Sequence, residues 1–343
     1  MKTTVHALAS LGPNQPLKPF SYDLGPLEPG QVDIAVESCG ICHSDLSMID
    51  NAWGMTTYPL VPGHEVVGKV VARGADTKRL KIGDRVGLGW FSASCGCCPS
   101  CLSGDQNLCP TAEGTIVQRH GGFATRVRAH WTCVSPLPDE LDASKAGPLF
   151  CGGITVFNPI VQCGVSPTDR VAVIGIGGLG HLAVKFLRAW GCEVTAFTTS
   201  ASKREEVLAL GAHRVLDTRN DGELMKMANE FDFILNTTNV GLGWNGYVAA
   251  LRPRGRLHTV GAVLEPMSLG ALPFIMGQRS LSGSALGSPA TVDTMLRFCA
   301  RHGIAPTTES FPMSRANEAL DHLRSGKARY RIVLMNDLPG DGA

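Results

Sequence analysis

The chain has 343 residues, with 31 lysines and arginines against 30 aspartates and glutamates and a formal net charge of +1. A chain of this length usually folds into more than one domain, because single hydrophobic cores stop growing at shorter lengths. The balance of charges excludes a strong electrostatic affinity for nucleic acid or anionic membranes. The N-terminal stretch lacks the apolar run of a signal peptide, and no run of 18 apolar residues occurs. We therefore expect a cytoplasmic protein of two domains.

Residues 1–150 are rich in Gly, Pro, Val and Cys. Short β-like runs such as QVDIAVES and HEVVGKVVARG alternate there with turn signals such as KIGDRVG. Isolated short runs between Gly-rich turns are typical of irregular β structure. This part of the chain predicts a mostly antiparallel β domain.

From about residue 169 the pattern changes to DRVAVIGIGGLGHLAVKFLRAWGCEVTAFTTS, which reads as strand, glycine turn, amphipathic helix and strand. Further strand candidates follow, separated by helix-like stretches: HRVLDT, FDFILNT, GRLHTVGA and SLSGSAL. Six strands alternating with helices predict a doubly wound parallel sheet, so the fold class is α/β. Two amphipathic helices and a last strand, YRIVLM, end the chain.

The stretch SCGICHSDL contains two cysteines and a histidine in the order C-x-x-C-H, from Cys39 through Cys42 to His43. This spacing is compatible with c-type haem attachment, with a redox dithiol, or with a single ligand to a metal completed elsewhere. Haem attachment is disfavoured because it requires export. Twelve cysteines in a chain without a leader favour metal ligation over disulfides.

Five cysteines lie within fifteen positions in one loop. Four of them follow the spacing C-x-x-C-x-x-C-x7-C, which excludes Cys97: Cys95, Cys98, Cys101 and Cys109. Four thiolates in a short segment match a closed tetrahedral zinc site, which stabilises a loop that has little core of its own. The seven-residue gap before the last cysteine argues against an iron–sulfur cluster. A nucleic-acid-binding zinc ribbon is the alternative, but the loop is not basic.

A G-x-G-x-x-G motif follows the first predicted parallel strand and opens a helix; it comprises Gly175, Gly177, Gly178, Leu179 and Gly180. This context is the one that a dinucleotide-binding turn requires. The first glycine permits the turn, the second lets the backbone approach a pyrophosphate, and the last allows close helix–strand packing. The helix N-terminus supplies unpaired N–H groups for the phosphates.

Units that prefer NAD usually carry Asp or Glu at the end of the second strand, where it binds the ribose 2′-hydroxyl. Here that position holds Thr198. Hydroxyls and a cation follow, from Thr199, Ser200 and Lys203. A 2′-phosphate would be repelled by a carboxylate and bound by hydroxyls with a cation. The sequence therefore predicts NADP(H); a solvated helix start with a serine N-cap is the alternative.

The remaining chemistry-bearing residues are Cys42, the GHE stretch with His64 and Glu65, and Cys151 just before the second domain. Two thiolates and one imidazole form the Cys2His ligand set of an open catalytic zinc site. Taken singly, a histidine or a cysteine is more often a buried structural residue.

Together these motifs resemble the zinc-dependent medium-chain alcohol dehydrogenases, and among them the cinnamyl-alcohol-dehydrogenase-like aldehyde reductases. The matching stretches run from about residue 35 to about residue 335: CGICHSDL, YPLVPGHEVVGKVV, KIGDRVGLGW, the four-cysteine loop, GIGGLGHLAVKF and AFTTSASKREE. The resemblance implies a GroES-like catalytic domain over residues 1–152, to which residues 289–343 return, and a Rossmann dinucleotide-binding domain over 153–288. It also implies a homodimer formed by edge pairing of the nucleotide-binding sheets.

The implied activity is reversible, zinc-dependent hydride transfer between NADPH and aldehydes, broad for aromatic and medium aliphatic substrates. Each subunit would hold one catalytic and one structural zinc ion. By resemblance, Cys42, His64 and Cys151 bind the catalytic zinc, and Glu65 lies close enough to exchange with water or substrate. Asp45 would orient the zinc-bound imidazole.

The same resemblance assigns Ser44 as the carrier of the substrate proton and places His43 near the cofactor phosphates. Many relatives have histidine at the position of Ser47, as the solvent end of the proton relay, and serine cannot act as a base near neutral pH. Trp53 and Trp90 would line the substrate pocket and favour flat or extended aldehydes. Ser284–Gly287 would lie near the nicotinamide.

Two alternatives remain at this point. A closely related one is an NAD-linked secondary-alcohol or polyol dehydrogenase, which the missing ribose-binding acid disfavours. A different one is a non-catalytic zinc protein that keeps the fold for binding. Loss of activity on chelation would exclude the second.

Overall fold

The structure is a computed structural model, and it describes residues 3–199, 201–219 and 221–340. The chain divides into two compact units, residues 1–154 with 287–343, and residues 155–286. The predicted boundaries, 152/153 and 288/289, lie two residues from these positions. Within the described ranges, none of the helices has the length and apolar character needed to cross a membrane.

The first unit is built on a seven-stranded sheet in which the path β16-β17-β3-β4-β5-β9 is joined by β8 on β3. All its pairs are antiparallel except β16 with β17. Its strands are β3 (Gln31–Ile41), β4 (Val66–Arg73), β5 (Arg85–Leu88), β8 (Arg126–His130), β9 (Val134–Pro136), β16 (Thr308–Pro312) and β17 (Arg331–Met335). In β8 buried and half-buried positions alternate, as expected when one face of a sheet covers a core.

Two small sheets and several helices complete this unit. The sheets pair β1 (Thr4–Ala9) with β2 (Lys18–Asp23), and β6 (Phe91–Ala93) with β7 (Glu113–Gly114). The α-helices are α1 (His43–Ile49), α2 (Pro99–Leu102), α3 (Ala143–Ala146), α10 (Pro289–His302) and α11 (Ala316–Arg324), and α4 (Gly152–Gln162) crosses the boundary. The 3-10 helices are η1 (Gln106–Leu108), η2 (Trp131–Cys133), η3 (Gly147–Phe150) and η5 (Met313–Arg315).

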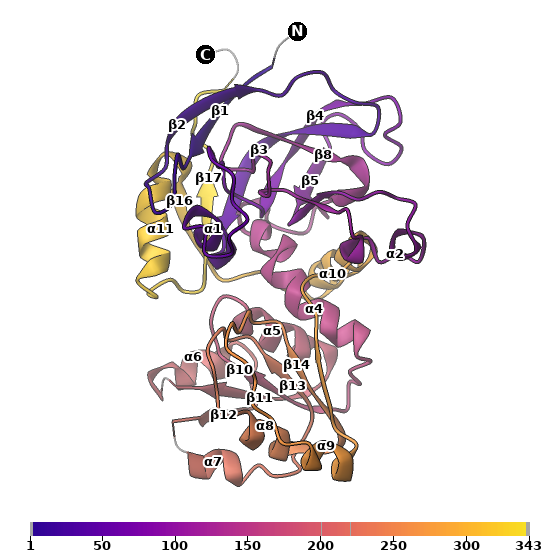
Figure 1. The fold of residues 1–343 in the computed structure, drawn as a ribbon, viewed down its shortest axis with the longest axis vertical. Helices are drawn as coiled ribbons and strands as arrows, with labels where there is room; N and C mark the ends of the chain where they lie inside the picture. The colour runs from indigo at the N-terminus through magenta and orange to yellow at the C-terminus, as the bar shows by residue number, and fades with distance from the viewer. Residues whose placement is uncertain (1–2, 200, 220, 341–343) are drawn as a thin grey trace. The chain divides into compact units, whose positions relative to one another are not determined.

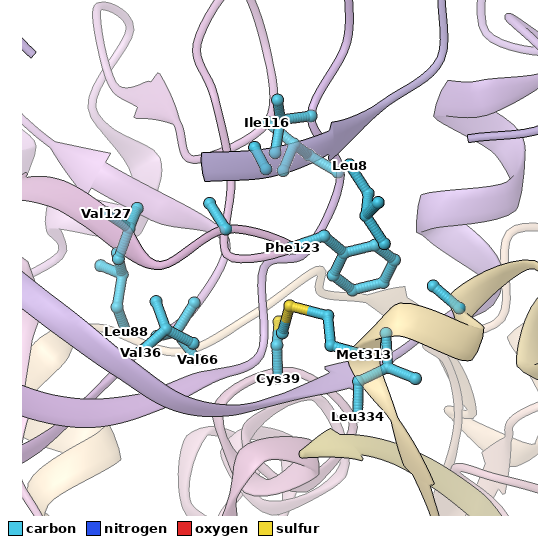
Figure 2. Close-up of a cluster of buried hydrophobic side chains, with 14 of the residues drawn as sticks. Leu8, Val36, Cys39, Val66, Leu88, Ile116, Phe123, Val127, Met313 and Leu334 are labelled. Atoms are coloured by element: carbon cyan, nitrogen blue, oxygen red, sulfur yellow. The ribbon is translucent and has the colours of Figure 1, made fainter. Parts of the chain in front are cut away.

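The core of the first unit joins residues from both ends of the chain. Cys39 of β3 is completely buried and lies among Phe123, Met313 and Leu334 (Figure 2). Strand β17 pairs antiparallel with β3, so that Leu334 is opposite Cys39 and Ile332 is opposite Ile41. The C-terminal strand therefore lies directly beside the start of the CGICHSDL stretch (Figure 1).

The second unit is a six-stranded, fully parallel sheet in the order β12-β11-β10-β13-β14-β15. Its strands are β10 (Arg170–Ile174), β11 (Glu193–Thr198), β12 (Arg214–Asp217), β13 (Phe231–Asn236), β14 (Leu251–Thr259) and β15 (Ser280–Gly283). Its helices are α5 (Gly180–Trp190), η4 (Ala201–Lys203), α6 (Arg204–Ala209), α7 (Asp221–Met225), α8 (Trp244–Ala250) and α9 (Leu272–Gly277). This architecture confirms the predicted fold class.

The chain order of the strands reverses between β10 and β13, and ligands of such sheets bind at the carboxyl ends on either side of that point. The central strands are buried on both faces, as residues 171–174 of β10 show, because helices cover both sides of a parallel sheet. Sequence reasoning missed β16. Its residues are half-buried or exposed and none is fully buried, which gives a weak strand signal.

Candidate metal and nucleotide sites

The first site begins at the N-terminus of α1, where Asp45 forms hydrogen bonds to two segments that are distant in sequence. Its Oδ2 accepts the backbone N–H of Cys42 at 2.9 Å, which caps the helix. Its Oδ1 accepts the backbone N–H of Gly63 at 2.8 Å and lies 3.0 Å from Nδ1 of His64. Because this carboxylate is fully buried, its three contacts bring the two segments together in one place.

Four predicted ligands converge next to Asp45. One ligand atom from each of Cys42, His64, Glu65 and Cys151 lies within 4.8 Å of all the others. Nδ1 of His64 faces Asp45, and Nε2 lies 3.3 Å from Sγ of Cys151, which is 3.9 Å from Sγ of Cys42. With the carboxylate at Nδ1, Nε2 faces the cluster, where it would offer its lone pair to a bound metal ion.

The protonation of this cluster reflects burial and close contact. The thiol of Cys151 donates to the sulfur of Cys42, which lowers the pKa of Cys42 well below its usual range and raises that of Cys151. Burial opposes a charge on His64, but Asp45 raises its pKa well above the usual range. Two sulfurs that share one proton beside an oriented imidazole are a donor set suited to a divalent cation.

Glu65 forms a buried ion pair with Arg331, a residue that sequence reasoning did not single out. Oε1 of Glu65 accepts a hydrogen bond from Nη2 of Arg331, and both side chains are nearly inaccessible to solvent. The other carboxylate oxygen, Oε2, is buried without a hydrogen-bond partner among the described residues. A side chain on Gly40 would collide with it, since an added Cβ would lie 2.0 Å from Oε2.

The orphan carboxylate oxygen and the two thiols meet the requirements of zinc. Buried carboxylate oxygens without a hydrogen bond are rare because their desolvation costs about 1–3 kcal/mol or more. Here the oxygen belongs to the same cluster as the two sulfurs and the imidazole. Cys42, His64 and Cys151 would hold the ion, with Glu65 as a nearby fourth group.

The other residues predicted for this site lie around the cluster. The Oγ of Ser44 is 3.7 Å from Sγ of Cys42 and is half-buried, whereas His43 is exposed. The ring of Trp90 packs edge-on against His64 with centroids 5.0 Å apart, and Trp53 packs edge-on against Trp90 at 6.0 Å. The two indoles thus extend from His64 to the surface.

The four-cysteine loop forms the second cluster. Ligand atoms of its members all lie within 4.8 Å of one another: Cys95, Cys98, Cys101 and Cys109. Backbone N–H groups of Cys97 and Cys98 donate to Cys95 and lower its pKa to about 5. The side chains of Leu102 and Leu108 are exposed, so the loop has little apolar core. A bound metal would therefore stabilise it.

We expect Cys98→Ser to remove one of two zinc ions per subunit, because serine does not replace a thiolate ligand. Cys97→Ser is the matched control. Cys97 is exposed, lies in the same loop and is outside the four-sulfur cluster, so this variant should retain two zinc ions. Zinc is measured by atomic emission on desalted protein. Loss of one equivalent from the Cys97 variant would contradict this ligand assignment.

The glycine turn follows β10 at the carboxyl edge of the parallel sheet. Gly175 has a positive φ of 84°, and an added Cβ would lie 2.4 Å from Thr238. A Cβ on Gly180 would lie 1.9 Å from the carbonyl oxygen of Gly175. Gly177 differs, because its φ is not positive and an added Cβ would meet no atom within 4 Å. Nothing in the described chain requires glycine there, whereas close approach of a phosphate would.

Thr237 supports this turn, although sequence reasoning did not single it out. It follows β13, and its Oγ1 lies 2.9 Å from the carbonyl oxygen of Ile174 and 2.7 Å from that of Gly175. From the other side, Nδ1 of His181 lies 3.1 Å from the carbonyl oxygen of Gly177. The turn is therefore held by side chains from two elements. Gly178 and Leu179 complete it, and Leu179 is the N-cap of α5.

The residues predicted to recognise the ribose lie at the end of β11. Thr198 is its last residue and is buried, and Thr199 beyond it is exposed. Lys203 ends η4. Ser200 lies outside the described residues. No acid occupies the end of this strand, as the sequence predicted.

A β unit that carries a Cys2His-type ligand cluster and a doubly wound unit with a glycine turn define a zinc-dependent dehydrogenase. Residues 28–139 match the family described as alcohol dehydrogenase GroES-like domain, and residues 178–301 match zinc-binding dehydrogenase. An aldehyde reductase of Synechocystis sp., AdhA, is 57% identical over 330 residues, covering 96% of this chain and 98% of the relative.

Two solved structures are also similar. A cinnamyl alcohol dehydrogenase of Sorghum bicolor has a TM-score of 0.93 and 36% identity, covering 97% of this chain and 98% of the other. A Helicobacter pylori cinnamyl alcohol dehydrogenase, described as complexed with NADP(H), has a TM-score of 0.90 and 28% identity, covering 98% and 99%. The chain belongs to the zinc-binding alcohol dehydrogenase family, in the group that contains aldehyde reductases and cinnamyl alcohol dehydrogenases.

Proposed function

We propose that this enzyme reduces aldehydes to primary alcohols with NADPH, reversibly, and that aromatic and medium aliphatic aldehydes are its substrates. The observation that carries the proposal is the cluster of Cys42, His64, Glu65 and Cys151 within 4.8 Å, ordered by Asp45. The names of the similar aldehyde reductase and cinnamyl alcohol dehydrogenase support the reaction class.

A zinc ion held by Cys42, His64 and Cys151 would supply a Lewis acid for a carbonyl oxygen. The role of Asp45 is to fix the tautomer and the orientation of His64 through the contact at Nδ1. Ser44, whose hydroxyl lies 3.7 Å from the sulfur of Cys42, is placed to hold the proton that the product oxygen receives.

The outward end of the proton path is incomplete in this chain, because Ser47 has no basic group. It lies in α1, one turn after Ser44, and is half-buried. Water can complete the path from there. We expect Ser47→His to change the pH–rate profile in the range where imidazole titrates; an unchanged profile would show that the relay does not pass this position.

NADP(H) is the cofactor that the carboxyl edge of the parallel sheet favours. The position where an NAD-binding chain has an acid holds Thr198, and Thr199 and Lys203 follow with a hydroxyl and a cation. The similar H. pylori enzyme, described as complexed with NADP(H), supports this choice. Ser200 and His43 are proposed as further cofactor contacts.

The aromatic pair of Trp53 and Trp90 supports apolar substrates. Trp90 contacts His64, and Trp53 extends the aromatic surface outward with 36% of its area exposed. Such a surface offers dispersion contacts to flat or extended chains and few hydrogen bonds to polyols. An NAD-linked secondary-alcohol or polyol dehydrogenase is therefore the less favoured alternative.

An assay panel tests the proposal. The zinc-replete enzyme is mixed with NADPH or NADH and with benzaldehyde, cinnamaldehyde, hexanal, acetone or a ketose. We expect rapid NADPH oxidation with the three aldehydes and loss of the rate after chelation. No rate with any of the aldehydes, or a higher kcat/KM with NADH, would refute it.

Gly177→Ala provides a test of the nucleotide site that does not depend on turnover. We expect the dissociation constant for NADP+ to increase at least about tenfold, since a Cβ would hold the pyrophosphate away from the backbone. Tm should remain the same or rise slightly, because the Cβ meets no protein atom and restricts the unfolded chain. Calorimetric titration and differential scanning measure the two quantities.

Gly180→Ala is the control for this experiment, because its Cβ would collide with the carbonyl oxygen of Gly175. It should lower Tm as well as affinity. A Gly177→Ala variant that binds NADP+ like the wild type would show that the backbone there is not a phosphate contact.

We also propose a homodimer and a cytoplasmic location. Strand β15 is an edge of the parallel sheet, and exposed apolar side chains lie near it in the chain: Leu264, Leu272, Ile275, Met276 and Leu281. Such an edge is a template for pairing with a second copy. All twelve cysteines are unpaired, which suits a reducing compartment. Light scattering that gives the monomer mass would refute the dimer.

A further inference from the structure

Strands β11 and β12 end side by side at the edge of the sheet that carries the glycine turn. Thr198, the last residue of β11, is opposite Asp217, the last residue of β12, in the parallel register. The backbone N–H of Thr218 donates to the carbonyl oxygen of Thr198 at 3.1 Å, so this alignment continues past the strand end. Neighbouring strands are about 4.8 Å apart, so side chains that follow β12 lie within reach of a group bound at Thr198.

Asp217 introduces a charge that conflicts with the proposed cofactor. A carboxylate one strand away from the ribose 2′ position would repel a 2′-phosphate, as an acid on β11 itself would. Arg219 neutralises it. Its Nε lies 3.0 and 3.2 Å from the two carboxylate oxygens of Asp217, and its Nη2 lies 2.5 Å from Oδ2. This contact lowers the pKa of Asp217 to about 2, so the pair is ionised throughout the neutral range.

The guanidinium of Arg219 retains donors for a second anion. The guanidinium has five N–H groups, and the carboxylate of Asp217 accepts one hydrogen bond from Nε and one from Nη2. Those on Nη1 have no hydrogen-bond partner in the part of the chain that the structure describes. The side chain is 61% exposed, which leaves it accessible to a ligand at the sheet edge.

Arg204, a nearby cation on α6, is engaged differently. Its Nη1 donates to the carbonyl oxygen of Val215 at 2.8 Å, within β12. The guanidinium of Arg204 therefore donates to the backbone of the strand. Among the residues described, that of Arg219 contacts only the carboxylate of Asp217.

We propose that Arg219 is a specificity-determining residue that binds the 2′-phosphate of NADP(H), and that Asp217 holds its side chain in position for that contact. The inference rests on the proposed NADP(H) dependence of the enzyme. The phosphate takes the free N–H groups of Arg219 and adds to the contacts expected from Thr199 and Lys203. NAD(H), which lacks the phosphate, gains nothing from this cation.

Calorimetric titration of the zinc-loaded full chain with NADP+ and with NAD+ tests the proposal. We expect Arg219→Gln to weaken NADP+ binding about five- to tenfold, the range for one charged contact at an exposed site, and to change NAD+ binding less than about twofold. The difference in NADP+ affinity between the wild type and Arg219→Gln should become smaller at higher salt concentration, because salt screens the contact.

Arg252→Gln is the matched control. Arg252 also pairs with an aspartate, since its Nη1 lies 3.0 Å from Oδ1 of Asp232, but it is the second residue of β14 and lies at the amino ends of the strands. This variant should change the affinity for neither nucleotide. Asp217→Asn keeps Arg219 but removes the carboxylate that holds its side chain, so NADP+ binding should weaken relative to NAD+, by less than in Arg219→Gln.

The outcomes separate the two proposals. If the wild type binds NAD+ as tightly as NADP+, the cofactor assignment is wrong. If the wild type prefers NADP+ and Arg219→Gln keeps the whole preference, or weakens both nucleotides equally, Arg219 is not a phosphate contact and the present inference is wrong. Weakening of NADP+ alone, absent in Arg252→Gln, supports it.

Discussion

Replacing Cys42 with serine is expected to remove one zinc ion per subunit and to lower kcat/KM at least about a thousandfold. The sulfur of Cys42 lies in the four-ligand cluster, and serine is a poor substitute for a thiolate. The loss corresponds to several kcal/mol of charge stabilisation that a Lewis acid supplies in such reactions. Atomic emission measures the zinc, and NADPH oxidation with benzaldehyde measures the rate.

Cys39 is the matched control, since it lies three residues earlier in the same stretch. The sequence predicts that Cys39→Ser keeps zinc and activity. The structure adds that Cys39 is fully buried in the core of the first unit (Figure 2), so a serine hydroxyl there would be desolvated. Cys39→Ala is the better variant, with full zinc content and a lower Tm. Loss of zinc from it, or its retention by Cys42→Ser, would overturn the assignment.

Replacing Arg331 with methionine is expected to lower the free energy of unfolding by about 3–5 kcal/mol, because it leaves a buried carboxylate without its partner. Glu65 is inaccessible, and its Oε1 accepts a hydrogen bond from Arg331. Complete burial already raises the pKa of Glu65, and the charges of Arg331 and His64 act against this. Urea unfolding of the zinc-loaded protein measures the change.

Two further variants test whether the loss of stability in Arg331→Met comes from the unpaired carboxylate. Arg324→Met removes an exposed pair, in which Nη1 of Arg324 lies 2.7 Å from Asp50, and should cost at most about 1 kcal/mol. Glu65→Gln combined with Arg331→Met should lower the free energy of unfolding by less than the sum of the single variants, because no unpaired buried carboxylate remains. Additive losses would show that Arg331 stabilises the unit by packing alone.

The spacing of residues within short stretches of the sequence was sufficient to predict much of this fold. The turn from Gly175 to Gly180 predicted a strand before it and a helix after it, and the structure has β10 and α5 there. The six-stranded parallel sheet followed from the alternation of apolar runs with helix-like stretches. The four-cysteine loop is also local, since its sulfurs meet within one segment.

The candidate catalytic cluster is different, because its parts are distant in sequence. Residue types alone suggested Cys42, His64 and Cys151 as a ligand set, the family resemblance supported the grouping, and the structure brings them within 4.8 Å of one another. Asp45 was expected to orient the imidazole, but its bonds to the backbone of Cys42 and Gly63 were not foreseen. Such contacts depend on where loops meet, which no local pattern encodes.

The sequence by itself determined the two domains, the parallel sheet, the glycine turn and the four-cysteine loop, because each depends on residues within about one supersecondary unit. Only the tertiary structure placed Arg331 against Glu65, Thr237 against the glycine turn, and the end of β12, which Arg219 follows, beside the end of β11. In each case the neighbouring group belongs to a separate segment of the chain, and strand order and register decide which segments meet. An isolated arginine or threonine carries no signal of that partner in the sequence, so these residues became visible only once the sheets were assembled.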